Sequence, residues 1–193
     1  MDAMAISDRT IVLASRSPRR RQLVAGMGFA VRYVDIDVEE KVPEGVTVAE
    51  IPLHLAKLKA ESFRGVLGED ELLVTADTVV AVDDTVLGKP HDAVDASRML
   101  RLLSGRCHSV YTGVCVKNNS RCISFVERTD VYFRDLSDDV ICRYVSQGSC
   151  MDKAGAYGIQ EWIGMVGVER IDGCYYNVVG LPVARLYDAV IHF

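Results

Sequence analysis

The sequence has no pair of cysteines in a CxxC pattern, although it contains six cysteines and four histidines. Because these residues also do not cluster with the spacing of zinc ligands, the sequence does not indicate a zinc site. A disulfide framework is the alternative, but a chain of 193 residues with 49% hydrophobic residues supplies a substantial core without one. We therefore expect buried, reduced thiols, as is usual in the cytosol. The six are Cys107, Cys115, Cys122, Cys142, Cys150 and Cys174.

Long hydrophobic runs are also missing. Nowhere do about 18 apolar residues run together, which is the length that a helix needs to cross a bilayer. The first ten residues, MDAMAISDRT, have neither a cationic start nor a long apolar segment, so we expect no signal peptide and a cytoplasmic protein. Since no internal repeat and no low-complexity linker occurs, we expect residues 1–193 to form one domain, folded as two lobes around one cleft.

Two signs of nucleic-acid or nucleotide binding are absent as well. The pattern GxxxxGK[ST] does not occur, so the chain has no P-loop. The net charge is −5, whereas proteins that coat nucleic acid usually carry positive charge over a whole face. A small anionic ligand is not excluded, because salt limits the reach of a charge to about 8 Å. A local arginine cluster can therefore dominate its own pocket.

Such a cluster is present in SRSPRRRQL, residues 15–23, which directly follows the apolar run Ile11–Ala14. Ser17 and Pro18 predict the start of a helix. The free N–H groups of a first helical turn and the positive end of the helix dipole attract anions. Arginines at this end oppose the dipole, so their accumulation indicates an anion site. A solvated basic helix start is the alternative. The four are Arg16, Arg19, Arg20 and Arg21.

The pattern of apolar residues predicts a mixed fold. We expect strands at residues 11–14, 29–36, 71–82 and 86–87, and a long hairpin over residues 108–133 that turns at Asn118 and Asn119. We expect helices at residues 17–28, 48–63, 92–103 and 137–146, and a last helix opened by Pro182. Residues 165–182 predict a strand, an Asp-Gly turn and a second strand. This mixture indicates one α/β or α+β domain.

Acidic side chains that could serve phosphate chemistry occur in two places. Asp77 in TADTVV follows an apolar strand, where a carboxylate can hold a divalent metal or accept a proton from water. An ordinary strand-end aspartate is the commoner explanation. Glu40 belongs to an acidic run that could supply a metal ligand, although such a run is more often a solvated rim. The run comprises Asp35, Asp37, Glu39 and Glu40.

Basic and amide side chains complete the set. Lys89 precedes a proline in LGKPHD and suits phosphate contact, although exposure is the ordinary explanation. Lys57 and Lys59 lie on a predicted helix about 200° apart, so at most one faces a given pocket. Gln160 ends DKAGAYGIQ, and its amide offers a donor and an acceptor to the edge of a base. Together with the carboxylates, these residues supply what phosphoryl chemistry on a nucleotide requires.

Seven ordered motifs in the chain resemble those of the Maf family of nucleoside triphosphate pyrophosphatases. They are LASRSPRRRQL, AKLKAES, ADTVV, GKPHDAVDASRML, SGRCHSVYTGV, DKAGAYGIQ and YNVVGLP, and they extend from about residue 11 to residue 187. The resemblance implies an α/β fold related to the inosine triphosphate pyrophosphatases, with an elongated mixed sheet bent around a central cleft and flanked by helices. It also implies a homodimer.

The resemblance assigns roles to individual positions. Asp77 corresponds to the proton acceptor of the family, and Glu40 to the glutamate that assists the metal, so that both carboxylates serve a divalent cation, Mg²⁺ or Mn²⁺. The phosphate-binding and catalytic basic residues correspond to Arg20, Lys59 and Lys89, with Ser15 opening the loop. Arg16 departs from the family, since its position is often small or uncharged, and Cys174 stands where serine is common.

The positions that select the substrate fall on Arg19, Thr78 and Gln160. These three residue types resemble the branch that hydrolyses dTTP and UTP, and a modified pyrimidine nucleotide is a further option for the substrate. The rival within the family is the branch that prefers 7-methyl-GTP. Outside it, the alternatives are a nucleotide-binding regulator of septum formation and a nucleic-acid-binding protein. The acidic net charge disfavours the last, so no nucleic-acid or membrane partner is expected.

Overall fold

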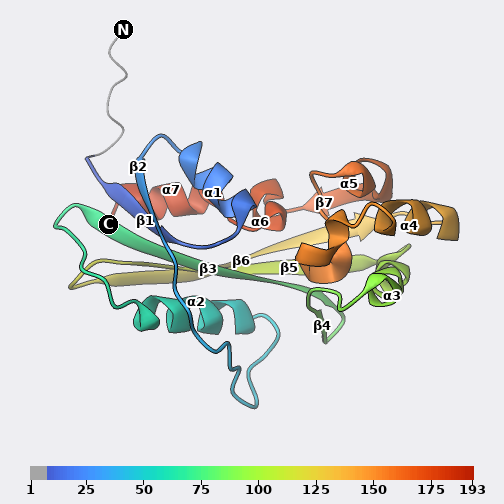
Figure 1. Cartoon of the computed structure of the whole chain (residues 1–193), viewed down its shortest axis with the longest axis horizontal. Coiled ribbons are helices and arrows are strands. Elements are labelled where there is room, and N and C mark those ends of the chain that lie inside the picture. The colour runs from blue at the N-terminus through green and yellow to red at the C-terminus, as the bar shows by residue number, and fades with distance from the viewer. Residues whose placement is uncertain (1–7) are drawn as a thin grey trace, which may run out of the picture. The chain divides into compact units, whose positions relative to one another are not determined.

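The structure is a computed structural model that describes residues 8–193 (Figure 1). Its strands are β1 Thr10–Ala14, β2 Ala30–Val34, β3 Glu71–Val82, β4 Thr85–Leu87, β5 Cys107–Lys117, β6 Cys122–Phe133 and β7 Val168–Asp172. Its α-helices are α1 Pro18–Ala25, α2 Ile51–Ser62, α3 Ala93–Leu103, α4 Asp138–Val145, α5 Trp162–Gly167, α6 Tyr175–Val179 and α7 Val183–Ile191. Two short 3-10 helices, η1 Ser149–Asp152 and η2 Ala154–Ala156, lie between α4 and α5.

Within the described residues the strands form a seven-stranded mixed sheet in the order β2-β1-β3-β5-β6-β7, with β4 paired to β3. β1 pairs in parallel with both β2 and β3, whereas β3 with β4 and β6 with β7 are antiparallel. The sheet does not close into a barrel, because β2 and β7 are its two ends. The expected α/β class with a mixed sheet and flanking helices is therefore confirmed.

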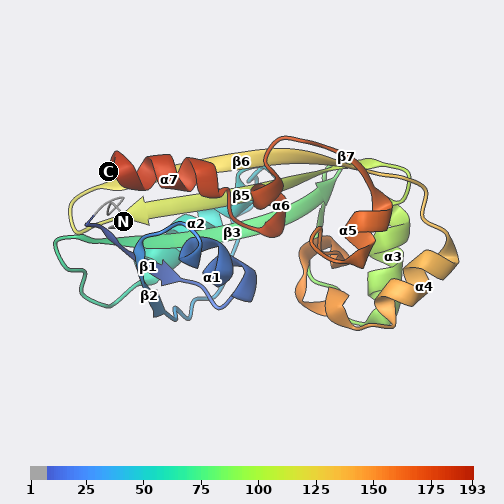
Figure 2. The same ribbon diagram turned by 90° about the horizontal axis from the view of Figure 1, so that it is seen from above.

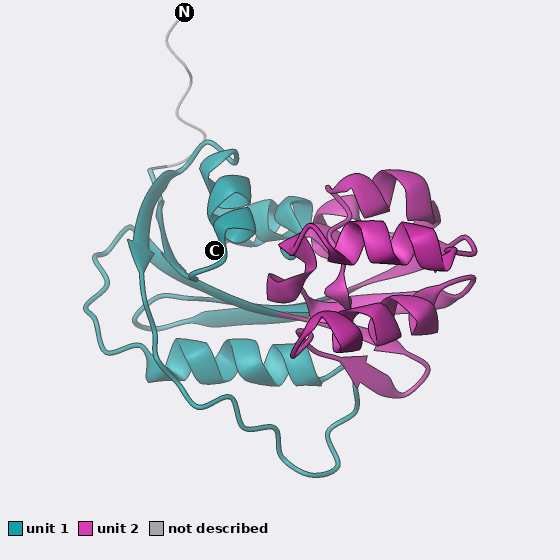
Figure 3. Ribbon diagram, turned by 45° about the vertical axis from the view of Figure 1, so that its right-hand side comes forward, with its two compact units in different colours: residues 1–77, 112–127, 180–193 teal, residues 78–111, 128–179 magenta. Residues whose placement is uncertain are grey.

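The chain divides into two compact units (Figure 3). Unit 1 comprises residues 8–77 of the described chain together with 112–127 and 180–193, and unit 2 comprises 78–111 and 128–179. Because β3, β5 and β6 are long strands, each contributes residues to both units. The expectation of two lobes around one cleft stays a prediction.

Helices cover both faces of the strands in unit 1, with α1 and α7 on one face and α2 on the other (Figure 1). The alternation of side chains along β1 agrees with this arrangement. Ile11 and Leu13 join the core beneath α1 and α7, whereas Val12 and Ala14 join the core beneath α2. β1 is buried on both faces, so it consists of consecutive apolar residues rather than alternating apolar and polar ones.

Two close contacts fix the outer layers of unit 1. α7 lies along β6 (Figure 2), where the Arg185 guanidinium donates to the carbonyl oxygen of Val126 at 2.7 Å. α2 approaches β5 at Gly113, where an added Cβ would lie 2.3 Å from the backbone nitrogen of Leu53. Only glycine permits this distance, so Gly113 sets how closely α2, the helix that carries Lys59, can pack on the sheet.

Unit 2 has a core of its own, which α3, α4 and α5 share with the ends of β5 and β6 (Figure 2). Leu100 and Leu103 of α3 are fully buried in it, together with Ile141 of α4 and Ile163 of α5. The helices α3 and α4 have the side-chain N-caps that their sequences indicate. The Asp92 side chain accepts from the Asp95 N–H at the start of α3, and the Ser137 side chain accepts from the Val140 N–H at the start of α4.

Most of the expected elements are confirmed to within a few residues at their ends, but the second strand expected in residues 165–182 is wrong. β7 is present, whereas Tyr175–Val179 forms the helix α6. The Asn177 amide, which is buried, donates to the Val110 carbonyl and to the Thr129 hydroxyl, both at 3.0 Å. These tertiary contacts outweigh the strand preference of aromatic and β-branched residues.

The cysteines are free thiols, but the expectation that they are buried holds only for Cys115 and Cys150. Three others, Cys107, Cys122 and Cys142, are exposed, and Cys174 is half-buried. In the part of the chain that the structure describes, no helix is both long and apolar enough to cross a membrane. The expectation about the first ten residues falls mainly on residues 1–7, outside the described residues.

Candidate active site

The position of Asp77 follows from the two-residue period of β3. Leu72, Val74 and Ala76 face the core beneath α1 and α7. The odd-numbered residues face α2 instead, and the Thr75 hydroxyl donates to the carbonyl oxygen of Ala56 in α2 at 2.6 Å. Asp77 is the next residue on that side of the strand. The Asp77 carboxylate therefore lies on the side of β3 that faces α2, the helix that carries Lys59.

Lys59 contacts two of the predicted carboxylates at once. Its Nζ lies 2.6 Å from Oδ1 of Asp77 and 2.8 Å from Oε1 of Glu40. The side chains of Lys59 and Asp77 are 16% and 14% exposed, whereas that of Glu40 is 52% exposed. The inner pair is thus shielded from screening by salt, and Glu40 closes over it from a loop. Lys57, two residues earlier on α2, is exposed, in agreement with the expectation that only one of the two faces a site.

The arginine segment begins directly after β1. The Ser17 hydroxyl accepts from the Arg20 N–H at 3.4 Å and so caps α1, while Ser15 Oγ accepts from the Ser17 N–H at 3.2 Å. β1 and β3 run in parallel with Leu13 opposite Val74. The carboxyl end of β1 and the start of α1 therefore lie beside the end of the apolar part of β3. This is a frequent place for phosphate in α/β folds.

Arg20 turns inward from this loop. Its Nη1 donates to the carbonyl oxygen of Ala76 at 2.8 Å, and its Nε donates to that of Gly180, also at 2.8 Å. Burial lowers the pKa of the Arg20 guanidinium, and the nearby Asp77 carboxylate opposes that shift. Arg19 lowers the pKa further, whereas Glu40 raises it. A desolvated cation in such surroundings is stabilised by each additional anion, such as a phosphate group.

The other arginines have different surroundings. Arg16 and Arg21 both lie near Asp35, at 3.7 Å and 3.4 Å, on the exposed surface. The Nε of Arg21 also donates to the Ser15 carbonyl at 2.8 Å, which fixes the start of the loop. Arg19 is half-buried. The cluster is therefore divided between surface pairing and a residue, Arg20, that is placed inside.

Three predicted site residues belong to unit 2. Thr78 is half-buried and follows Asp77 in β3. Lys89 is exposed and follows β4, and the carbonyl oxygen of its neighbour Gly88 accepts from the Gly155 N–H at 3.1 Å. Gln160 is exposed at the end of the segment that follows η2. The structure thus joins Arg20, Lys59, Asp77 and Glu40 within unit 1, which also carries Ser15 and Arg19. Thr78, Lys89 and Gln160 belong to unit 2.

The expectation of a divalent cation can be compared with the donors present. Among residues 8–193 there is no group of three or more His, Cys, Asp or Glu side chains that could hold a metal ion. Asp77 and Glu40 do converge on one ammonium, so two carboxylates are near each other. Mg²⁺ characteristically uses one or two carboxylates and takes its other ligands from water and substrate phosphates. The two carboxylates fit an ion that arrives with a nucleotide.

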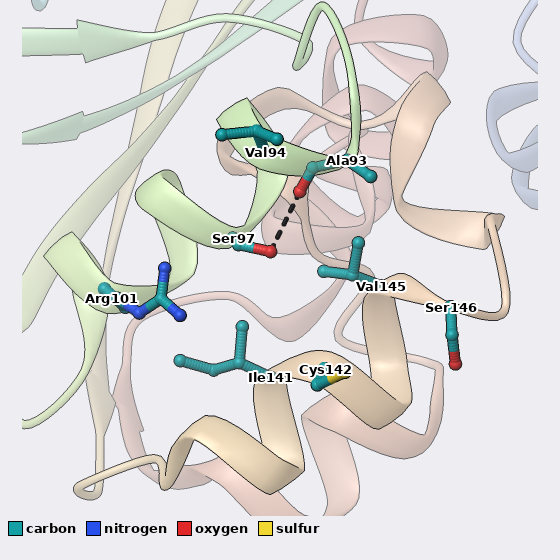
Figure 4. A pocket seen from close by; sticks show the side chains of 8 residues that line it. All are labelled: Ala93, Val94, Ser97, Arg101, Ile141, Cys142, Val145 and Ser146. Atoms are coloured by element: carbon teal, nitrogen blue, oxygen red, sulfur yellow. Dashed lines mark hydrogen bonds between the residues drawn. The ribbon is translucent and has the colours of Figure 1, made fainter.

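A hollow of about 430 Å³ lies in unit 2 between α3 and α4 (Figure 4). Its lining is mostly apolar, and the Ser97 hydroxyl within it is already bonded to the Ala93 carbonyl at 2.8 Å. None of the predicted site residues lines it. Arg101, a cation in the lining, is already paired with Asp138 at 2.8 Å. The charged cluster in unit 1 is therefore the better candidate for a site that holds a triphosphate.

Two features of the site were not predicted from the sequence. The Gly180 carbonyl that holds Arg20 belongs to the motif YNVVGLP, for which the sequence predicts no role in the site. The direct pairing of Lys59 with Asp77 was also missed, since we expected Lys59 to bind phosphate. A glycine before Leu-Pro is a signal for an unusual backbone, and Gly180 indeed has a φ of 125°. No sequence pattern signals the lysine pairing.

Comparisons with known proteins cover nearly the whole chain. The family model described as Maf-like protein matches residues 10–193. A dTTP/UTP pyrophosphatase of Parabacteroides distasonis is 46% identical over 95% of both chains. Proteins of the same name from Phocaeicola vulgatus and Bacteroides fragilis are 48% and 49% identical over 92% of both chains. With this extent of match, the chain belongs to the Maf family.

Proposed function

We propose that this protein is a nucleoside triphosphate pyrophosphatase that hydrolyses dTTP and UTP to the monophosphate and pyrophosphate. The observation that carries the proposal is the cluster of Arg20, Lys59, Asp77 and Glu40, two cations and two carboxylates, at the carboxyl end of a parallel strand. It supports the proposal because this is the donor set that phosphoryl transfer to water requires. The relatives named dTTP/UTP pyrophosphatase support the choice of base.

In the proposed reaction, Asp77 orients a water molecule and accepts its proton as the water oxygen attacks the α-phosphorus. The new P–O bond forms there while the bond from the α-phosphorus to the bridging oxygen breaks, and the electron pair leaves with pyrophosphate. Arg20, Lys59 and Lys89 stabilise the charge that grows on this leaving group. One such contact at 4 Å is worth about 4 kcal/mol at an effective dielectric constant near 20, before desolvation.

A divalent cation, Mg²⁺ or Mn²⁺, would be held by Asp77 and Glu40 together with phosphate oxygens. Bound there, it would neutralise phosphate charge and favour attack at phosphorus. Lys59 now contacts both carboxylates, so in this proposal its ammonium moves to the phosphates as the nucleotide arrives. In this proposal, Arg19, Thr78 and Gln160 select the pyrimidine base, and Ser15 contacts the phosphates. The protein would act as a homodimer in the cytoplasm.

The test is a panel of dTTP, UTP, CTP, the 5-methylated forms of UTP and CTP, GTP and 7-methyl-GTP with Mg²⁺ or Mn²⁺ in H₂¹⁸O. We expect pyrophosphate release from dTTP and UTP, with the heavy oxygen in the monophosphate, since attack at the α-phosphorus transfers water oxygen there. Label in pyrophosphate would contradict the mechanism. Turnover of 7-methyl-GTP alone would overturn the choice of base, and tight binding without any turnover would favour a nucleotide-binding regulator.

A further inference from the structure

A buried lysine in unit 2 lies beneath the segment that carries Gln160. Lys153 is 7% exposed, and its Nζ donates to the Ser149 carbonyl at 2.5 Å and to Asp152 Oδ1 at 2.6 Å. The same ammonium forms an ion pair with Glu161, whose Oε1 lies 2.8 Å from Nζ. Two N–H donors of the ammonium group are therefore used in hydrogen bonds, and its charge is paired with the Glu161 carboxylate. Because Lys153 and Glu161 are the first and last residues of segment 153–161, their contact fixes the distance between its ends.

The second carboxylate oxygen of Glu161 extends this network. Oε2 accepts from the Ser149 hydroxyl at 3.0 Å and from the phenol of Tyr144, a fully buried residue of α4. Burial and the bond to Glu161 raise the pKa of Tyr144, so its phenol remains a donor. The Tyr144 oxygen in turn accepts from the Gly158 N–H at 3.2 Å. The network thus reaches from α4 to the backbone in the middle of the segment.

The backbone of the segment packs directly on the ion pair. A Cβ added at Gly158 would lie 2.8 Å from Cε of Lys153 and 2.9 Å from Cδ of Glu161, so that any larger residue would displace the two paired side chains. Gly155 and Ala156 both have left-handed conformations, with φ of 69° and 58°. For alanine this conformation costs about 1 kcal/mol, and it persists only where the surroundings hold it. The ion pair supplies such a constraint.

Both ends of the constrained segment adjoin residues of the proposed reaction. Gln160, which we assign to the base, directly precedes Glu161. The Gly155 N–H donates to the carbonyl of Gly88, the residue before Lys89. Displacement of the segment would therefore change the positions of an amide that reads the base and of a lysine that contacts phosphate.

We infer that Lys153 and Glu161 are positioning residues that set the base selectivity of the enzyme through Gln160 and support Lys89 through Gly155. The inference rests on the proposed function. A buried ion pair is weak evidence for stability, because desolvation offsets the attraction between its charges. The pair matters here for geometry, because three oxygen atoms converge on one ammonium and tie both ends of the segment to it.

The experiment compares the ratio of kcat/KM for dTTP to that for dCTP in the wild type, Lys153→Met and Glu161→Gln. These bases differ in the groups that an amide can distinguish, and a neutral hydrogen bond is worth up to about tenfold. We expect both variants to lower the ratio about threefold to tenfold. The ratio does not depend on how much enzyme is folded. Val131→Ala, which opens a cavity in the core of the same unit, is the control and should keep the wild-type ratio.

Amide hydrogen exchange at Gly155 and Gly158 supplies a readout that needs no activity. We expect faster exchange in Lys153→Met than in Val131→Ala at equal global stability. Unchanged exchange, or an unchanged dTTP-to-dCTP ratio, would overturn the inference. If Lys153→Met does not fold, Glu161→Gln decides the question, since it keeps the shape of the side chain while it removes the charge and one of the two acceptor oxygens. A wild type that hydrolyses neither nucleotide would overturn the proposed function instead, and exchange would still decide whether Lys153 orders the segment.

Discussion

The ammonium of Lys59 and the carboxylate of Asp77 lie 2.6 Å apart, and each side chain is less than one-fifth exposed. The proposed base is therefore already paired with a cation before any nucleotide binds. A triphosphate carries several negative charges and competes for that cation. Binding of the substrate would thus free the carboxylate oxygen at the moment when a water molecule has to be oriented.

Lys59→Met should lower kcat for dTTP by about 100-fold, which is the usual effect of removing one preorganised donor from a transition state. The physical reason is that both Asp77 and Glu40 lose their shared cation while the leaving group loses a contact. Steady-state pyrophosphate release measures it. Lys57→Met, two residues earlier on the same helix and exposed, is the matched control and should stay near the wild-type rate. Equal losses in both variants would count against a specific role of Lys59.

Arg20→Lys should lower kcat/KM about tenfold or more, because an ammonium cannot reproduce the planar donors of a guanidinium. In the wild type these donors hold the Ala76 and Gly180 carbonyls at 2.8 Å, one of them adjacent to Asp77. Arg16→Lys is the control, since Arg16 is exposed and pairs with the exposed Asp35 at 3.7 Å. Kinetics that do not distinguish the two variants would show that the inward arginine is not part of the site.

The free energy of unfolding should decrease at acidic pH because of His108. This residue is 2% exposed, and burial lowers its pKa to about 4. The unfolded chain binds this proton at about pH 6.5, so the folded state loses stability as the pH falls from 6.5 towards 4 and gains none above 6.5. The Asp130 carboxylate opposes this lowering of the pKa. The Nε2 atom of His108 is hydrogen-bonded to the hydroxyl of Tyr157 at 2.8 Å.

The contribution of His108 between pH 7.5 and pH 5.0 is about 2 kcal/mol in the free energy of unfolding. Urea denaturation at the two pH values measures it, and His108→Gln should reduce the loss of stability on acidification by about that amount, since glutamine does not titrate. The same loss in both proteins would mean that other groups cause the acid sensitivity.

The sequence predicted what depends on local rules. Ser17 and Pro18 identified the start of α1, and its side-chain cap is present. Asn118 and Asn119 identified the turn between β5 and β6, where the Asn118 side chain accepts from the Arg121 N–H at 2.8 Å. In each case a backbone preference of one or two residues decides the structure, so neighbouring sequence is sufficient.

The sequence could not give features that depend on distant partners. Tyr175–Val179 has the composition of a strand but forms a helix, because Asn177 bonds to β5 and β6 and Gly173 lies close to Thr129. The burial of Lys153 depends on Glu161, eight residues later, in a segment without regular periodicity. The contact between Lys59 of α2 and Asp77 likewise could not be predicted, because it depends on how α2 packs on the sheet at Gly113.

The most direct test of the account is Asp77→Asn, measured both for turnover of dTTP and for binding of a non-hydrolysable α,β-methylene analogue. Asparagine keeps the shape of the side chain but does not accept a proton from water. Asp84→Asn, an exposed aspartate in the turn after β3, controls for the same change of charge. We expect Asp77→Asn to lose about 10²-fold to 10⁴-fold in kcat while its affinity stays within a few-fold of the wild type. Turnover as fast as in Asp84→Asn would contradict the role of Asp77 as the base.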